Sequence, residues 1–553
     1  MAFHSEVGSG TDRASTTGFG NKASSDLLTK FVQFACSQHV ATVAVNAGGT
    51  GYVVGDELTL THGSAHLDAR FEVTTVSGGV ITGLRIVSSG AFALQATTAT
   101  VGTGGSGYAV NDILQVQGGS SRMPAKFLVA TLSGSAVATV TLYEGGGVYS
   151  SAPSNDAATL GVSSGFAGDD ACELTLAAFQ AIIGTTGLSV TGGTGSSATV
   201  DITLAETGWS VDTRDSNDFT DSYDAVGDEK QVTLKGDASG FTNKPYVHLT
   251  TLEAASGLDT RHAIEVLMST AHNTSLTIAN QPGISPSAHT TSSQFMLMPE
   301  ENANDVDFWF KVTDRFIYVE ANENPAANTD DGRYVWLAAG YYDRLGTESE
   351  DPFPGFVGAS AITGSSNAQV GNENVSGIAE QYWSSSNIHG SRYYDASAST
   401  WRTIHNGDSV GVSSETYVMF PFGEKRNNIT ASNTAYQITY DEALFFDLGI
   451  ISRSRASSSR ILRRVPGTTP EFMLYPLVII SQATSATPGG NVSDRVVGTI
   501  PGIFWIYNDD NSTGAAITNF SEDYITIGTD RYRVFHNHVH TDRYQYIAVL
   551  EDV

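Results

Sequence analysis

The sequence predicts a mainly β protein, in which small repeated β-units are inserted in a larger, multi-strand, β-sandwich-like body. Two observations support this fold class. Short stretches alternate apolar and polar residues and are separated by Gly, Ser and Asn, which is typical of antiparallel strands joined by tight turns. In addition, residues 48–60 return as residues 104–116, so that Gly51 matches Gly107 at an offset of 56 residues. Such an internal repeat indicates a folding unit that has been copied.

The N-terminal 40 residues are predicted to form an arm and one short helix. Residues 1–25 are rich in Gly, Ser and Thr, and we expect an extended arm that is ordered only against a neighbour. A helix is predicted from Asp26 to about Gln38, with Ser24 or Ser25 as its N-cap. Its apolar positions follow the spacing i, i+3, i+4 and i+7 and are Leu28, Phe31, Val32 and Ala35.

Residues 41–150 are predicted to form two tandem β-repeats. The pairs that keep the repeat offset are Tyr52 and Tyr108, Asp56 and Asp112, and Phe71 and Phe127. The glycine before each tyrosine predicts a turn whose tyrosine covers a small barrel or sandwich. We interpret residues 151–205 as a degenerate third β-unit, with strands at 188–190 and 198–202 and a short helix near 177–183.

Residues 206–553 are predicted to form the β-rich body, as one domain or two subdomains. All six tryptophans lie here, and the apolar stretches are longer and more aromatic than in the repeats. The polar stretch 364–399 is predicted to be a long loop. The expected strands are 231–234, 246–249, 308–312, 315–319, 334–338, 417–422, 472–480, 502–507 and 532–538.

Composition excludes several classes of function. The net charge of −29 repels phosphate backbones, so we expect no nucleic-acid partner. The two cysteines, Cys36 and Cys172, have neither disulfide-framework nor zinc-site spacing. No signal peptide is expected, and the longest apolar run, residues 472–480, is far shorter than the ~20 residues that cross a bilayer. We therefore expect synthesis in a host cytoplasm and no membrane insertion.

Three sets of short motifs carry a resemblance. They are the helix at 25–31 with Gly208-Trp209-Ser210-Val211; the stretch 308–319 with 340–342 and 351–358; and 502–505 with 525–528 and the closing aromatic strand. This set resembles the structural virion proteins of tailed bacteriophages, of the tail or baseplate type. The Gly-Tyr β-repeats are also similar to modules of phage tail and fibre proteins. Between the helix and Gly208, residues of about 41–205 have the character of an insertion.

The resemblance implies a structural component of a virion, located in the tail, baseplate or tail tip. It implies a homo-oligomer in contact with other virion proteins, without enzymatic activity and without a cofactor. Two other functions remain open from the sequence. One is a receptor-binding tail fibre that contacts host surface glycan, and the other is a glycan-degrading tail protein. Virion position, oligomer number and host organism are left undetermined by the sequence.

The sharpest site-like cluster is His536, His538 and His540. On a strand these side chains share one face, about 6.6 Å apart between successive members. Two of them could chelate a transition metal, or three copies could meet on a symmetry axis, as in trimeric phage spikes. We favour a solvated strand face, because no Cys or suitable carboxylate nearby completes a site. No metal ligand is therefore assigned.

Three loop motifs are interpreted as turns. Residues 509–514 open like a calcium loop, but Phe520 stands where a bidentate Glu is needed, and Glu522 would require a longer loop. Residues 328–332 are predicted to be a hairpin turn. Gly102, Gly104 and Gly107 match a dinucleotide fingerprint, yet a strand rather than a helix is expected after them, so that function is excluded.

Carboxylates among aromatic residues are the candidates for glycan cleavage, which needs two of them across a pocket. They are Asp314, Glu320, Asp343, Glu348, Glu350 and Asp351. Aromatic pairs could form a glycan platform, although we favour subunit interfaces. These pairs are Tyr341-Tyr342, Tyr382-Trp383 and Tyr393-Tyr394.

Overall fold

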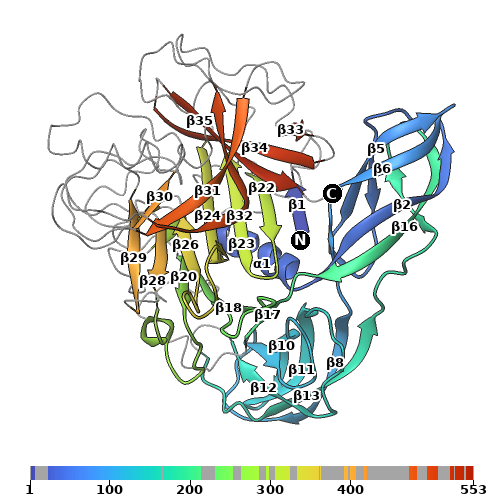
Figure 1. Cartoon of the computed structure of the whole chain (residues 1–553). Coiled ribbons are helices and arrows are strands. Elements are labelled where there is room, and N and C mark those ends of the chain that lie inside the picture. The colour runs from blue at the N-terminus through green and yellow to red at the C-terminus, as the bar shows by residue number, and fades with distance from the viewer. Residues whose placement is uncertain are drawn as a thin grey trace, which may run out of the picture.

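The protein is mainly β, as the sequence predicts, with one α-helix in the part of the chain that the structure describes. The computed structural model describes residues 2–6, 23–162, 166–212, 231–252, 263–284, 294–297, 306–323, 333–359, 361–362, 391–395, 399–405, 416–419, 472–481, 495–508, 524–527, 530–540 and 543–551. Two small β-modules project from a larger β body (Figure 1).

The body contains a sandwich of two antiparallel layers. One layer is a six-stranded sheet in the order β17-β18-β19-β20-β21-β27, and the other is formed by the first strands of a 14-stranded sheet. Between the layers lie apolar side chains such as Val247, Val266, Phe310 and Leu337, all at most 1% exposed. The strands of the first layer are β17 (Trp209–Val211), β18 (Gln231–Gly236), β19 (Tyr246–Leu252), β20 (Ala263–Ser269), β21 (Gln294–Leu297) and β27 (Ala361–Ile362).

The 14-stranded sheet follows the order β1-β22-β23-β24-β26-β28-β29-β30-β31-β32-β35-β34-β33, with β25 paired to β32. Every strand predicted for the body occurs in one of the two sheets. The strands of the larger sheet are β1 (Ala2–Glu6), β22 (Val306–Val312), β23 (Phe316–Glu323), β24 (Arg333–Tyr341), β25 (Asp343–Arg344), β26 (Gly355–Ala359), β28 (Ser391–Asp395), β29 (Thr400–His405), β30 (Thr416–Met419), β31 (Phe472–Ser481), β32 (Arg495–Asn508), β33 (Tyr524–Ile527), β34 (Asp530–His540) and β35 (Arg543–Glu551).

Two N-terminal and loop predictions need correction. The first residues of the arm form β1, which pairs with β22 of the same chain, rather than an arm ordered only against a neighbour. The stretch 364–399 is not entirely loop, because it contains β28, which pairs with β26 and β29. The remaining residues from 364 to 390 lie outside the described part of the chain. Ser391–Asp395 form a strand because the neighbouring strands β26 and β29 supply its backbone hydrogen bonds.

The helix α1 runs from Ala23 to Ala35, three residues earlier than predicted at each end. Ser24 and Ser25 are therefore in its first turn and neither is the N-cap. Gln38 instead begins a strand, because its backbone pairs with Glu206. The predicted apolar face is confirmed, since Leu28, Phe31, Val32 and Ala35 are each at most 1% exposed.

Module 1 is a small barrel-like unit with its own apolar core, which includes Tyr52, Phe71 and Val200. It is built from two short sheets, in the orders β14-β16-β2-β7-β4 and β15-β3-β5-β6. Its strands are β2 (Gln38–Thr50), β3 (Glu57–Leu60), β4 (Ala65–Leu67), β5 (Ala69–Ser77), β6 (Val80–Ser88), β7 (Ala91–Phe92), β14 (Leu188–Ser189), β15 (Thr191–Gly192) and β16 (Ser196–Glu206).

Module 2 is a second unit of the same design, with Tyr108, Phe127 and Leu174 in its core. Its single sheet has the order β11-β10-β9-β12-β13-β8. The strands are β8 (Gln95–Gly104), β9 (Ile113–Val116), β10 (Lys126–Ser133), β11 (Ala136–Glu144), β12 (Ala157–Gly161) and β13 (Cys172–Gln180).

The two modules are nested rather than arranged in tandem. The chain starts module 1 with β2–β7, builds the whole of module 2 with β8–β13, and then returns to finish module 1 with β14–β16. The closing strands are equivalent, because β13 pairs with β8 in one module as β16 pairs with β2 in the other. Residues 151–205 thus contribute strands to both modules instead of folding as a third unit. The helix expected near 177–183 is absent, since β13 occupies residues 172–180.

A type II turn directly follows each Gly-Tyr pair, whose glycines, Gly51 and Gly107, also lie in the left-handed region at φ +84° and +83°. In each copy the turn has a residue in the left-handed region at its third position, Gly55 at φ +92° and Asn111 at φ +77°. That conformation suits Gly and Asn best. The Asp56 and Asp112 carboxylates each accept a hydrogen bond from the backbone N–H three residues earlier, at 3.0 and 2.8 Å. The motif is therefore a rigid turn and not a nucleotide-binding loop, and β8 ends at Gly104 without a following helix.

Candidate functional site: the corners where modules and body meet

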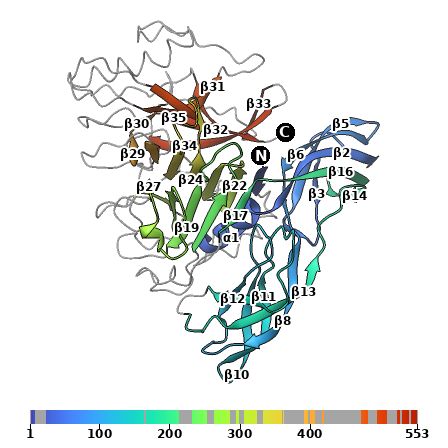
Figure 2. The ribbon, with the colours of Figure 1, turned by 60° about the horizontal axis from the view of Figure 1, so that its bottom comes forward.

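Helix α1 lies at the centre of the molecule, between the body strands and the strands that lead into the modules (Figure 2). Its buried face belongs to one apolar cluster that also contains Leu67 of module 1, Met123 of module 2 and Phe310 of the body. Leu67 and Met123 are separated by the repeat offset, so equivalent corners of the two modules join the same apolar cluster. The apolar core is thus continuous from the body into both modules.

The body and module 1 are joined by two chain segments, residues 35–38 and 206–208, which we call the outer neck. The Thr207 hydroxyl donates to the Ala35 carbonyl at 2.6 Å, and Gln38 Nε2 donates to Glu206 at 3.3 Å. Gly208 follows with φ +88°. These bonds hold the outgoing and returning segments side by side.

Trp209 fixes the returning segment in the body. Its ring is fully buried, and its Nε1 donates to the Thr313 carbonyl at 2.6 Å, in the turn between β22 and β23. The motif Gly208-Trp209-Ser210-Val211 is therefore an anchor, and its residues Trp209–Val211 form strand β17.

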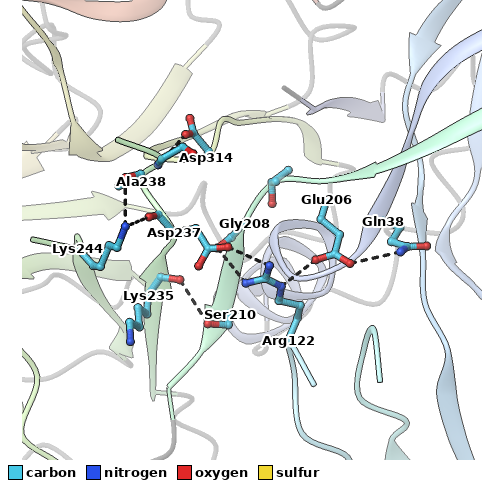
Figure 3. A network of polar contacts seen from close by, with 12 residues as sticks. Gln38, Arg122, Glu206, Gly208, Ser210, Lys235, Asp237, Ala238, Lys244 and Asp314 are labelled. Carbon is cyan, nitrogen blue, oxygen red and sulfur yellow. Dashed lines mark hydrogen bonds and ion pairs between the residues drawn. The ribbon is translucent and has the colours of Figure 1, made fainter. Parts of the chain in front are cut away.

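Arg122 of module 2 binds both the outer neck and the body (Figure 3). Its guanidinium donates to Glu206 at 2.9 Å, to Asp237 at 2.9 Å and to the Gly208 carbonyl at 3.3 Å. Burial alone would lower the pKa of Arg122, but the hydrogen bonds to Asp237 and Glu206 outweigh it and raise the pKa. The Val211 N–H also donates to the Arg122 carbonyl at 2.7 Å.

The magnitudes assign different roles to these contacts. Glu206 and Asp237 keep 32% and 55% side-chain exposure, and partly exposed ion pairs contribute only about 0.2–1 kcal/mol. Met123 is 1% exposed, and burial of such a side chain contributes about 1.5–3 kcal/mol. The apolar contacts around α1 therefore contribute most of the stability of the junction between modules and body. The hydrogen bonds of Arg122 fix the orientation of module 2.

Module 1 reaches the body through a second charged group. Arg531 of β34 contacts Glu72 of module 1 at 3.1 Å and Glu551 at 2.6 Å, while Arg85 contacts Glu72 at 2.6 Å and Arg533 contacts Glu551 at 2.9 Å. Arg531 and Glu551 are nearly buried, and burial lowers the pKa of Arg531. Removing one partner would leave a buried charge uncompensated.

Most carboxylates that the sequence singles out lie at one end of the body sandwich. Arg315 contacts Asp314 at 3.7 Å and Asp343 at 3.1 Å, the Thr242 N–H donates to Glu348 at 2.7 Å, and the Tyr342 hydroxyl donates to Asp351. Burial raises the pKa of Asp343. Each carboxylate in this group holds a loop or an arginine.

Two candidate carboxylates have separate positions. Glu350 accepts from the backbone and hydroxyl of Thr347 at 2.9 and 3.0 Å. Glu320 lies inside the body, 3% exposed, and accepts a hydrogen bond from Tyr318. The structure therefore does not bring Glu320 to the carboxylate end.

The aromatic pairs do not form an exposed platform where the structure describes them. Tyr341 and Tyr342 are fully buried within the chain itself, so the interface interpretation is wrong for this pair. Tyr394 packs against the body core, with its ring 5.1 Å from that of Phe353. Tyr382 and Trp383 lie outside the described residues.

The histidine cluster lies on β34, as predicted, although the described strand pairing is irregular between Asn537 and His540. The side chains of His536, His538 and His540 are outside the description, as are residues 328–332 and 509–523. The strands on either side of 328–332 pair as an antiparallel hairpin, with Glu323 opposite Arg333. Among the described residues, no group of three or more His, Cys, Asp or Glu side chains could hold a metal ion.

A buried serine–histidine contact escaped the sequence analysis. His248 Nε2 lies 2.8 Å from Ser269 Oγ, and its Nδ1 lies 3.0 Å from Thr233 Oγ1. The Ser269 hydroxyl donates to the Ala271 carbonyl at 2.8 Å, so His248 is the donor in the histidine–serine bond. This proton arrangement is structural, because an activated serine must donate to the histidine.

Arg122 also escaped the sequence analysis, since its partners are 84 and 115 residues away. The repeat offset could have drawn attention to it, because Arg122 and Met123 match His66 and Leu67. No protein-family model matches the chain, and no curated protein matches it significantly. No helix in the described part of the chain is long and apolar enough to span a bilayer.

Proposed function

We propose that the protein is a structural component of a tailed-phage virion, in the tail, baseplate or tail tip, acting through interfaces between copies and with other virion proteins. The observation that carries this proposal is the fixed display of two modules on a sandwich body. Both modules join the apolar cluster of the body helix through Leu67 and Met123, and Arg122 and Arg531 connect them to the body from two sides. The segments that carry the phage resemblance, Trp209 and residues 308–319, build the anchor and the core of that body.

The test is the location of the protein in purified particles. We expect it in virions in a fixed copy number by mass spectrometry, and as a homo-oligomer in solution by light scattering. A labelled copy imaged in intact particles gives its position. A monomer that is absent from purified particles would overturn the proposal.

The module tips support a receptor-binding fibre as the second candidate. Val54 and Val110 occupy the same position of the two type II turns and are 59% and 50% exposed. Neither module uses this valine in its core, yet both copies have it. In this function the tips contact host surface glycan or protein.

Binding of the purified protein to host cells or to purified envelope polysaccharide tests this candidate. The double variant Val54→Asp and Val110→Asp should lose binding and keep its melting temperature. A variant at another exposed site of module 2, Thr98→Asp, is the matched control and should bind normally. Equal binding by both variants would exclude the tips as the contact.

A further inference from the structure

The chain passes from module 1 to module 2 and back through residues 93–95 and 180–183, which we call the inner neck. Ser64 of module 1 binds both segments. Its carbonyl accepts from the Ala93 N–H and from Gln95 Nε2, each at 3.0 Å, and its Oγ accepts from the Ile183 N–H at 3.1 Å. Ser64 is fully buried, so the inner neck is organised around one residue.

His62 orients Ser64. The Ser64 N–H donates to His62 Nδ1 at 3.1 Å, and Ser64 Oγ lies 2.8 Å from the same nitrogen. A nitrogen that accepts from a backbone N–H carries no proton of its own. The Ser64 hydroxyl proton is therefore directed at Nδ1, and the arrangement requires a neutral His62.

His66 is the second histidine of this corner. Its Nε2 lies 3.2 Å from the Gly146 carbonyl of module 2. Burial lowers the pKa of His66, and this effect exceeds those of Glu144 and of the hydrogen bond to Gly146, which raise it. A neutral His66 therefore suits the closed contact between the modules.

Comparison of the two copies shows that both histidines belong to the connection. At the repeat offset, Gly118 stands in place of His62 and Arg122 in place of His66. The carbonyl of the matching serine, Ser120, accepts from the Ser150 N–H at 2.8 Å, a contact that lies within module 2 itself. Histidines thus occur only in the copy whose corner holds a second module.

We propose that the inner neck is an acid-sensitive hinge, in which protonation of His62 and His66 releases module 2 from its fixed position on module 1. The carboxylates around this corner stabilise the protonated histidines in the closed form only in part. Glu144 faces His66, but Lys126 contacts it at 2.7 Å and Gln33 at 3.4 Å. On the His62 side the carboxylate is Asp68, which accepts from Thr61 at 3.0 Å.

Acid acts on the two histidines by different routes. A protonated His62 has no Nδ1 lone pair for the Ser64 N–H. Ser64, which binds both segments of the neck, then loses the contact that orients it. Protonated His66 would be a partly buried cation, and the open form takes up that proton more readily. For His66 the sign follows from burial, which lowers its pKa in the closed form, so release is favoured as pH falls below the ordinary histidine range. This hinge does not depend on the virion function.

The test measures the distance between the modules in the whole chain. Spin labels are placed at Ser77→Cys and Ser133→Cys, exposed positions related by the repeat, while Cys36 and Cys172 are buried. The distance distribution is recorded between about pH 8 and about pH 5.5. We expect it to broaden and its maximum to shift as pH falls. A label pair within module 2, at Thr100→Cys and Ser133→Cys, should stay unchanged.

Two substitutions identify the titrating groups. His62→Asn keeps an acceptor for Ser64 without titrating, and His66→Gln removes the second histidine. The double variant should show one narrow distribution at every pH, whereas Ser64→Ala should show the broad one at neutral pH. The proposal fails if the parent distribution does not change, if the double variant responds like the parent, or if the pair within module 2 also changes.

Discussion

The repeat shows which single residues are required for the backbone conformation of the two module turns. Gly55 and Asn111 hold the same left-handed position, so the backbone there is required in both copies. A side chain added at Gly55 would meet no atom within 4 Å. Any effect of a substitution at this position is therefore conformational and not steric.

We predict that Gly55→Val lowers the free energy of unfolding by about 1–3 kcal/mol, because a β-branched residue resists a positive φ. Gly55→Asn, which copies the residue of module 2, should cost clearly less. Urea unfolding followed by circular dichroism checks both variants. Equal losses for Val and Asn would contradict the conformational explanation.

Among the elements, α1 has the largest role. Phe31 and Phe34 pack with their rings 5.3 and 5.6 Å from that of Phe310, and the same cluster reaches both modules. The two modules and the body therefore share one apolar cluster around α1, instead of each module having a separate interface with the body. Its sequence periodicity predicts a buried face, but not that three parts of the molecule share it.

We predict that Phe31→Ala costs about 3–5 kcal/mol, as expected for truncation of a large core side chain. Lys30→Ala, which removes a cation 5.2 Å from the Phe308 ring, should cost at most about 1 kcal/mol. Thermal unfolding provides the comparison. If α1 joins the parts, Phe31→Ala should also separate the unfolding of the modules from that of the body.

Strand β23 contains a buried acid with a calculable pH effect. Burial raises the pKa of Glu320 well above its ordinary value of 4.5, although the hydrogen bond from Tyr318 acts in the opposite direction. Folding therefore favours the protonated carboxyl. The stability from this group is complete below about pH 4.5 and declines as pH rises towards the folded-state pKa.

We predict that Glu320→Gln makes the protein more stable than the parent at neutral pH, by more than about 1 kcal/mol, which is the equivalent of one pKa unit. The difference should vanish towards pH 4.5. Melting temperatures measured across this range provide the check. Parallel profiles for variant and parent would show that Glu320 is charged in the folded protein.

For the whole molecule, the nesting makes a prediction about fragments. Residues 94–180 contain every strand of module 2 and should fold alone. Residues 38–150, which include the tandem pair predicted at residues 41–150, lack the closing strands of both modules and should not fold. Amide dispersion in NMR spectra distinguishes the two outcomes. A folded 38–150 fragment would show that the closing strands are dispensable.

The sequence predicts local structure well and long-range pairing poorly. Period-two alternation reveals β strands such as β3 and β5, the long apolar run reveals β31, and the repeat reveals the turns. The pairing of the closing strands β13 and β16 is hidden, although a strand is predicted at 198–202, because their partners β8 and β2 lie far away along the chain. The roles of Arg122 and Ser64 depend on contacts formed only after folding, so composition and spacing carry no direct signal for them.

Nesting also sets an order in time. During synthesis, β13 emerges before β14–β16, so the inner module can close while the outer one still lacks its last strands. Module 1 can close only after Glu206, and the body only after its strands that follow Trp209 have emerged. The order of folding is therefore module 2 first, then module 1, and then the body. A pause in translation once Glu206 has left the ribosome would leave both modules complete beside an unfinished body.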